Sequence, residues 1–479
     1  MVNEGAAKKD QVDTTSAQYD DMCDKWALVF DLIAGTRRMR ERGQKWLPKE
    51  TREDNDAYAV RLARSFLYNA TKDTRDKWVS RPFSKPLTLQ NADTLDDRLK
   101  DIQWDADLAG RTLDALASDL FENALETGKC HLLVDYPSVS SDLSLEDEEK
   151  LDLRPTFVQI RSQDLFAWRA ERRPNGEPRL TQIRWRENTV EADGEWSDRI
   201  VERIRVMTPT TWEVWEKVTT KTGEEYQQVS EGTHTFGEIP LVTAYFNRAG
   251  FMVSESTLDD ISWLNLAHWQ SQSDQRNILR FARVGMIFVK GLSKDEFEAG
   301  LTVGPNEMIA STNDQADAKV VEHSGKAIAA GRQDLLDLEQ KMEVLGVQPL
   351  VNRANPTVIG QAIGENKSVT VIQSWVRVME TMLEDAYELA ATWIKADIPD
   401  DFAVDIFNDF GISLDDTREV EALLKARVAG EITQQTLLNE LKRRGVLSDS
   451  LDVEDEVEAT TEEDARGLDV NVNLEGEIE

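Results

Sequence analysis

The spacing of apolar residues changes twice along this chain of 479 residues. Up to about residue 128, and again from about residue 257, apolar residues recur every three or four positions, which is typical of amphipathic helices. Between residues 156 and 246 they alternate with polar residues or form β-branched runs, and turn residues separate them. We therefore expect an α+β fold that is mainly helical and contains an antiparallel sheet with one solvated face.

Three helices are expected before the sheet, after an N-terminal arm of residues 1–24. They cover residues 25–42, 54–79 and 105–127, and Gly128 suits the C-cap of the third. Residues 130–137 are expected to form a buried strand that ends at a proline. The sheet is expected to be a meander of about five strands, over residues 156–160, 180–185, 200–206, 211–215 and 226–229.

Beyond the sheet the pattern predicts helices over residues 257–283 and 327–345, with short β segments at 286–289, 307–310 and 319–321 between them. Residues 346–364 contain two prolines and three glycines, which is typical of a loop. The strongest helical pattern in the chain then covers residues 366–394. A strand-like piece follows at 402–407, and two further helices are expected at 414–429 and 434–444.

Composition limits the class of protein. The chain has 56 basic and 90 acidic residues, a net charge of −34, so a broad basic surface for tight binding to nucleic-acid phosphates is excluded. Residues 448–479 contain thirteen acidic residues and one arginine, and we expect a disordered acidic tail there. Two cysteines exclude a disulfide scaffold, and no apolar run has the length of a secretory signal or a membrane span. We expect a soluble protein that is made in the cytoplasm.

The residue types that carry chemistry form no convincing constellation. The four histidines, at 131, 234, 268 and 323, are too far apart in the chain for a zinc motif, and Gly325-Lys326 is followed by Ala327 where a phosphate loop needs Ser or Thr. Asp401, Asp405 and Asp409 would share one helix face and suit a two-metal nuclease, but a strand here would scatter them. We expect no catalytic residues, no metal and no cofactor.

Four segments resemble a group of tailed-bacteriophage portal proteins long known only as a domain of unknown function. YNATKDT at residues 68–74 is similar to the Y-N-x-T-x-x-T segment of that group, and TGKCHLLVDYP at 127–137 is similar to its G-x-x-x-L-L-V-D-Y-P segment. LDDISWLNLAHWQSQSD at 258–274 resembles its L-x-D-L-A-x-L-N-x-x-H-Y-Q-S-x-A-D motif. AGEITQQT at 429–436 resembles a hairpin near portal C-termini. The third segment departs from the pattern at Ile261, Ser262, Trp269 and Ser273, without altering its apolar register.

The resemblance implies a portal fold with an antiparallel β wing, a two-helix stem, a small α/β clip, a long wing helix and a helical crown. Carried onto this chain, it divides residues 25–447 into named parts between the arm and the acidic tail. These are the wing 25–250, stem helix 251–284, clip 285–325, stem helix 326–346, tunnel loop 347–365, long wing helix 366–399 and crown 400–447.

The resemblance also implies function. Portals form a ring, here expected to hold twelve copies, at one capsid vertex of the virion after assembly in the host cytoplasm. The ring conducts double-stranded DNA without sequence specificity and contacts major capsid protein, scaffold, terminase and head–tail adaptor, with no membrane partner. The tunnel loop would meet DNA through Asn352, Arg353, Asn355, Thr357 and Lys367. The clip would face terminase and adaptor through Lys290, Lys294, Asp295, Glu296 and Glu307.

The residues agree with this interpretation at three points. Strands in the clip have open edges, which neighbours in a ring can pair. Residues 347–365 have the composition of a loop, and the acidic charge of a ring would repel DNA and let it slide, within a screening length of about 8–10 Å. Other interpretations stay open: a metal-dependent nuclease, another head–tail connector ring, or a cellular scaffold with an acidic tail.

Overall fold

The structure of the chain is a computed structural model. It describes residues 11–136, 153–220, 223–284, 286–291, 294, 313, 315–321, 325–347, 371–408, 423–428 and 430–443, with residues 447, 453, 456 and 457. The chain divides into two compact units. The first comprises Met1–Pro349 and Val371–Asn408, and the second comprises Leu350–Thr370 and Asp409–Glu479.

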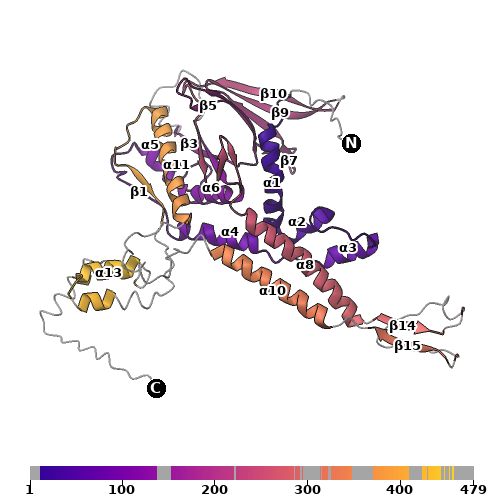
Figure 1. The fold of residues 1–479 in the computed structure, drawn as a ribbon. Helices are drawn as coiled ribbons and strands as arrows, with labels where there is room; N and C mark the ends of the chain where they lie inside the picture. The colour runs from indigo at the N-terminus through magenta and orange to yellow at the C-terminus, as the bar shows by residue number, and fades with distance from the viewer. Residues whose placement is uncertain are drawn as a thin grey trace. The chain divides into compact units, whose positions relative to one another are not determined.

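Helices of the first unit precede and follow its sheets (Figure 1). The α-helices are α1 Ala17–Ile33, α2 Gly35–Arg42, α3 Asn55–Arg64, α4 Ala70–Ser80, α5 Asp97–Lys100, α6 Leu113–Thr127, α8 Asp259–Val284, α10 Gly325–Val347 and α11 Val371–Ile394. Short 3-10 turns occur at Gly43–Lys45, Pro82–Ser84 and Asp101–Gln103. The helices predicted over residues 257–283, 327–345 and 366–394 therefore exist close to their predicted bounds, as α8, α10 and α11.

Helix α1 begins inside the predicted N-terminal arm of residues 1–24. The hydroxyl of Ser16 accepts a hydrogen bond from the backbone N–H of Tyr19, and this N-cap starts the helix at Ala17. The helix is amphipathic, and Tyr19 and Met22 of its first turns are buried. The prediction for the arm was therefore wrong from Ala17 onward, because the sequence reading missed this cap.

The helix predicted over residues 54–79 is two helices. After α3 the backbone is extended at Ser65, and α4 starts afresh at Ala70 behind an Asn69 N-cap, whose side-chain oxygen accepts from Lys72 N. The helix predicted over 105–127 also starts late, at Leu113, because Leu108 and Gly110 have positive φ angles and Thr112 caps the helix. Its predicted C-cap is confirmed, since Gly128 adopts a left-handed conformation.

The α+β class is confirmed, with mixed helices and antiparallel sheets. The strands are β1 Thr88–Gln90, β2 Lys129–Asp135, β3 Thr156–Ile160, β4 Leu165–Arg172, β5 Pro178–Arg186, β6 Thr189–Ala192, β7 Asp198–Val201, β8 Arg203–Met207, β9 Thr211–Thr220, β10 Gly223–Thr233, β11 Leu241–Tyr245, β12 Arg248–Gly250, β13 Val253–Ser254, β14 Met286–Lys290, β15 Asp317–Val321 and β16 Ala403–Asp405. Every strand pair among the described residues is antiparallel.

The predicted five-strand meander was partly wrong in its membership. The five-stranded sheet has the order β10-β9-β8-β5-β4 and contains β4, which the sequence reading missed. Strand β3 belongs instead to a three-stranded sheet of order β11-β2-β3, where Leu133 pairs with Val158 and Leu241. A local alternating pattern cannot distinguish these partners, because it specifies only which face of a strand is buried.

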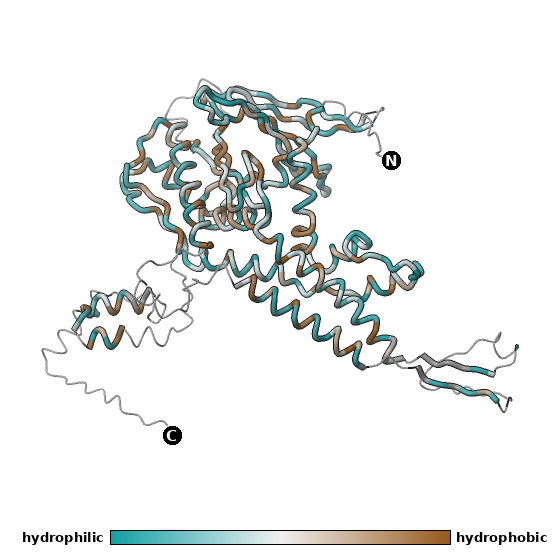
Figure 2. The backbone as a smooth tube through the Cα atoms, in the orientation of Figure 1, coloured by the Kyte–Doolittle hydropathy of each residue, from teal (hydrophilic) through white to brown (hydrophobic). Residues whose placement is uncertain are grey.

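Helix α11 packs its buried face against the three-stranded sheet and β16. The Sγ atom of Cys130 lies 3.6 Å from the Sδ atom of Met382, and the ring of Phe157 lies edge-on to Tyr387 at 5.3 Å. On its other side the helix holds β16, because the carboxylates of Glu384 and Glu380 accept from Val404 N and Ile406 N at 3.1 and 3.0 Å. Figure 2 shows hydrophobic residues recurring along the helices in the same way.

The second unit is described at residues 423–428, 430–443 and four later positions. Residues 423–428 are helical, and α13 Gln434–Arg443 follows. The predicted N-cap is confirmed, since Thr433 Oγ1 accepts from Thr436 N at 3.1 Å. Of the acidic tail predicted over 448–479, only residues 453, 456 and 457 are described, and their backbone is helical.

Candidate functional site

Helices α8 and α10 pack side by side, and the β14–β15 hairpin lies between them in chain order (Figure 1). We call these four elements the helix–hairpin unit. Three polar contacts join the helices: His268 Nε2 with Glu339 Oε1 at 3.1 Å, Ser271 Oγ to Asp334 Oδ2 at 2.7 Å, and Gln275 Nε2 to the Ile328 carbonyl at 2.8 Å. Gly331 permits the last of these, because a Cβ there would lie 2.2 Å from Gln275 Oε1.

Two of the segments that carry the family resemblance meet in space. Asn265 of α8 is fully buried, and its Oδ1 accepts from both the backbone N–H and the hydroxyl of Thr71 at 3.1 Å. Its Nδ2 donates to the carbonyl of Tyr68 at 2.7 Å. The ring of Tyr68 also lies 5.4 Å from that of His268. Tyr68, Thr71 and Asn265, which match the motifs of segments 68–74 and 258–274, therefore have a structural role: they hold the start of α4 on α8.

Replacing Asn265 with alanine is expected to lower the free energy of unfolding by about 2–3 kcal/mol, because buried donors at Thr71 and an acceptor at Tyr68 lose their partner. Urea denaturation followed by tryptophan fluorescence measures this. Asn277 on the same helix is the matched control, since it makes no side-chain hydrogen bond among the described residues. Its alanine variant should differ from the parent by less than about 0.5 kcal/mol. Equal losses for the two variants would contradict this role of Asn265.

The departures from the family motif also have physical reasons. Ser273, where the motif has alanine, accepts a hydrogen bond from Ser65 Oγ at 2.8 Å and lies 3.5 Å from Arg61 Nη1. It therefore ties α8 to the extended break between α3 and α4. Trp269, where the motif has tyrosine, is fully buried in a cluster with Leu28, Leu32 and four other buried apolar residues.

Buried charge fixes α4 against α6. The guanidinium of Arg75 donates to the carboxylates of Glu122 and Glu126 at 2.7 and 2.6 Å. Burial raises the pKa of Glu126, and the hydrogen bonds from Arg75 oppose that rise. Arg75, Glu122 and Glu126 form a structural bridge between the two helices. Among the described residues, they line none of the cavities that we find.

One tryptophan, Trp78, contacts the two helices that flank the segment predicted as a tunnel loop. Trp78 Nε1 donates to the carbonyl of Gly346, near the end of α10, at 2.7 Å. The ring of Trp78 lies 5.7 Å from that of Trp375, in the first turns of α11. Trp375 in turn stacks on Phe246 at 5.3 Å with an interplanar angle of 7°. The end of α10 and the first turns of α11 are therefore both in contact with the side chain of Trp78.

The predicted site residues are only partly described. Asn352, Arg353, Asn355, Thr357 and Lys367 of the tunnel loop and Asp295, Glu296 and Glu307 of the clip lie outside the described residues. Lys290 ends β14 and pairs with Asp317 of β15 at 3.4 Å, and Lys294 is exposed. Of the ten predicted residues, the structure therefore describes two, and it places Lys290 in the β14–β15 strand pair.

The carboxylates considered for a nuclease do not form a described site. Asp405 lies in β16, paired with Thr88, while Asp409 lies outside the described residues. Within the described ranges no group of three or more His, Cys, Asp or Glu side chains is placed to hold a metal ion. A strand at Asp405 separates its side chain from those of its neighbours.

We expect purified protein to leave plasmid DNA intact with Mg²⁺ or Mn²⁺, because a two-metal nuclease needs converging carboxylates. Agarose gel electrophoresis measures cleavage, with Asp405→Asn as the matched variant. Metal-dependent cleavage that disappears in this variant would contradict the non-catalytic interpretation.

Sequence reasoning missed the anchor made by Trp78, Gly346 and Trp375. The signal was weak, because a tryptophan in a helix is usually explained by packing alone. Gly346 was read only as part of a loop. Gly346 lies so close to α4 that a Cβ on it would be 2.9 Å from Thr74 Oγ1. This contact joins residues that are more than 260 positions apart in the chain, so no local pattern indicates it.

The first unit is thus an α+β body that carries a helix–hairpin–helix insertion and a long buried helix. Residues 257–394, which span this insertion and α11, match a protein family described as a domain of unknown function (DUF4055). No curated protein matches the chain. None of the helices in the described ranges is long and apolar enough to cross a membrane.

Solved structures to which the chain shows some similarity include chains of gene transfer agent (GTA) particles. One is from the neck of an empty GTA particle computed with C6 symmetry, at 12% identity and a TM-score of 0.40, covering 76% of this chain and 87% of that one. A second is from the neck of a native GTA particle computed with C12 symmetry, at 13% identity and a TM-score of 0.37, covering 79% and 90%. A third is from the virion of a native GTA particle, at 11% and 0.36, covering 86% and 95%. Similarities this low assign no function to the chain.

Proposed function

We propose that the chain is a portal protein, which forms a ring of twelve copies at one capsid vertex and conducts double-stranded DNA. The observation that supports the proposal is the order of elements: the helix–hairpin unit is followed in the chain by the long helix α11, the order expected of a stem, a clip and a long wing helix. In this assignment α8 and α10 are the stem helices of residues 251–284 and 326–346. The β14–β15 hairpin belongs to the clip of residues 285–325.

The hairpin suits a ring interface. In the described part of the chain, β14 and β15 pair only with each other, so each strand has one open edge. Open edges are protected in native proteins, and strands from neighbouring copies protect them in a head-to-tail ring. We propose that terminase and later the tail adaptor dock on this clip, through Lys290, Lys294, Asp295, Glu296 and Glu307.

The anchored loop suits a channel. Trp78 contacts both Gly346 of α10 and Trp375 of α11, the helices on either side of residues 347–365. We propose that it faces DNA in the channel through Asn352, Arg353, Asn355, Thr357 and Lys367. The net charge of −34 per chain disfavours tight binding, so DNA of any sequence can slide. The remaining parts are assigned as the wing 25–250, long wing helix 366–399 and crown 400–447.

Mass in solution tests this proposal. Twelve copies of a 54.3 kDa chain give about 650 kDa. Light scattering on purified protein is expected to give this mass at high concentration. A mass of one chain at every concentration, with and without capsid scaffold, would contradict a ring.

A further inference from the structure

Helix α2 and the residues that follow it form a local basic surface on a chain whose net charge is −34 (Figure 1). Residues 35–49 contain one acidic residue, Glu41, and six basic residues. The basic residues are Arg37, Arg38, Arg40, Arg42, Lys45 and Lys49. We call residues 35–49 the basic segment. It includes none of the residues proposed for the tunnel loop or the clip.

One buried carboxylate holds two of these arginines in place. Asp31 of α1 is 2% exposed, and the chain turns after it at Gly35, whose φ is +85°, so that α2 packs against α1. The Asp31 carboxylate accepts from Arg38 Nε at 2.9 Å and from Arg42 Nε at 2.9 and 2.8 Å. It also accepts from Trp46 Nε1 at 2.8 Å. Both guanidinium groups are therefore held at the surface before any ligand arrives, which reduces the entropy lost on binding.

The four arginines of α2 make their hydrogen bonds through Nε. Arg37 Nε donates to Glu41 Oε1 at 3.1 Å, and Arg40 Nε donates to the Ser65 carbonyl at 2.9 Å. An ion pair also joins Arg38 Nη1 to Glu41 Oε2 at 3.5 Å. Within the described residues, none of the hydrogen bonds of these arginines uses an Nη atom. Each guanidinium therefore keeps Nη donors for the oxygens of a phosphate or a carboxylate.

The side chains of this surface favour phosphates over a protein partner. Met39 is the apolar residue of α2 and is fully buried, so the exposed side of the helix is hydrophilic (Figure 2). The side chain of Arg37 is 92% exposed, and Lys45 is exposed with its Nζ 4.7 Å from the centre of the Trp46 ring. Protein–protein interfaces have an apolar or aromatic core, whereas protein–DNA interfaces are more polar and strongly positive.

We propose that the basic segment binds the phosphate groups of duplex DNA without sequence specificity. The binding residues are Arg37, Arg38, Arg40, Arg42 and Lys45. The acidic charge elsewhere on the chain does not prevent this contact, because salt screens charges over about 8–10 Å. Five phosphate contacts predict that the logarithm of the association constant falls with the logarithm of salt concentration, with a slope of about −4.5.

Fluorescence anisotropy of a short labelled duplex tests this proposal on the full-length protein. At low ionic strength the dissociation constant is expected to be about 1–10 µM, since all contacts are to the backbone. Arg37→Gln/Lys45→Gln changes two exposed side chains. It should weaken binding about tenfold and make the salt slope shallower by about 2. The matched control is Arg169→Gln/Arg172→Gln, which removes the same charge from exposed positions of β4 and should bind like the parent.

Competition with poly-glutamate distinguishes phosphates from the carboxylates of an acidic protein. At equal concentrations of charge it should displace the duplex about tenfold less effectively than unlabelled DNA, because a flexible peptide loses conformational entropy that a rigid duplex does not. Equal affinities of the two double variants, equal competition by poly-glutamate, or no binding at low ionic strength would each overturn the proposal. Both variants keep the residues proposed for the tunnel loop and the clip, so these outcomes separate this site from the proposed portal function.

Discussion

Replacing Gly128 with alanine is expected to lower the free energy of unfolding by about 4 kcal/mol. A Cβ at this position would lie 2.0 Å from the carbonyl oxygen of Glu255 and 2.7 Å from its carbonyl carbon, so two main chains would have to separate. The φ angle of +82° adds about 1–2 kcal/mol for a residue with a side chain. Overpacking of this kind costs about 1–3 kcal/mol or more.

The main chains cannot separate without losing hydrogen bonds. The carbonyl of Gly128 accepts from Phe246 N and Asn247 N at 2.9 and 3.0 Å, and its N–H donates to Ala124 O at 2.8 Å. Gly110→Ala is the matched control, because Gly110 has a φ of +83° with nothing within 4 Å of a Cβ. It should cost only about 1 kcal/mol. Urea denaturation of both variants measures the difference, and equal losses would show that backbone conformation alone explains the effect.

Lys129→Met is expected to abolish a rise of stability between pH 7 and pH 10. Lys129 is fully buried in β2, where its Nζ donates to the carbonyl of Met252 and lies 5.1 Å from the ring of Trp168. Burial lowers the pKa of Lys129 from 10.5 to about 7. Between these values the unfolded chain binds a proton that the folded chain does not, so the free energy of unfolding increases with pH.

The expected difference between parent and Lys129→Met grows by about 3–4 kcal/mol from pH 7 to pH 10, since one pKa unit corresponds to about 1.4 kcal/mol. Urea denaturation at several pH values measures it, and groups common to both proteins cancel. Lys129→Arg is the control, because its guanidinium stays charged throughout the range and should show no such recovery. A constant difference between parent and Lys129→Met would mean that the buried amine keeps its ordinary pKa.

The sequence was sufficient where one apolar stripe defines one element. Helices α8, α10 and α11 lie close to their predicted ranges because each buries a continuous face, as the run from Ile372 to Ala391 shows. The C-cap at Gly128 and the N-cap at Thr433 were also predicted, since these caps depend on residues next to the helix. The β segments predicted at 286–289 and 319–321 are confirmed as β14 and β15, while the one predicted at 307–310 lies outside the described residues.

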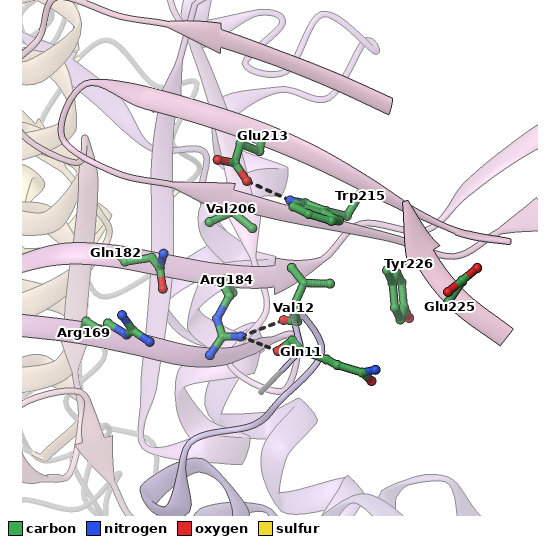
Figure 3. A pocket seen from close by; sticks show the side chains of 10 residues that line it. All are labelled: Gln11, Val12, Arg169, Gln182, Arg184, Val206, Glu213, Trp215, Glu225 and Tyr226. Carbon is green, nitrogen blue, oxygen red and sulfur yellow. Dashed lines mark hydrogen bonds between the residues drawn. The ribbon is translucent and has the colours of Figure 1, made fainter. Parts of the chain in front are cut away.

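The sequence was insufficient to predict the features of the fold that depend on contacts with residues far away in the chain. The break before α4 depends on Asn265, which binds Thr71 from 194 residues away. The pairing of β1 with β16 joins Thr88 to Asp405, and no local pattern at either strand indicates the other. The predicted channel residues were chosen from a resemblance and loop composition, so their roles remain predictions. The cavity beside Arg184 was not predicted at all, because its lining comes from five strands and from residues 11–12 (Figure 3).

Negative-stain electron microscopy of the purified protein tests the central claim most directly. The portal interpretation predicts single rings with a central hole and twelvefold symmetry in class averages, at a mass of about 650 kDa for twelve chains of 54.3 kDa. In destabilised variants such as Gly128→Ala, the number of rings should fall only by the fraction of chains that are unfolded. A uniform population of compact particles with the mass of one chain and no central hole, also in the presence of scaffold, would contradict the account.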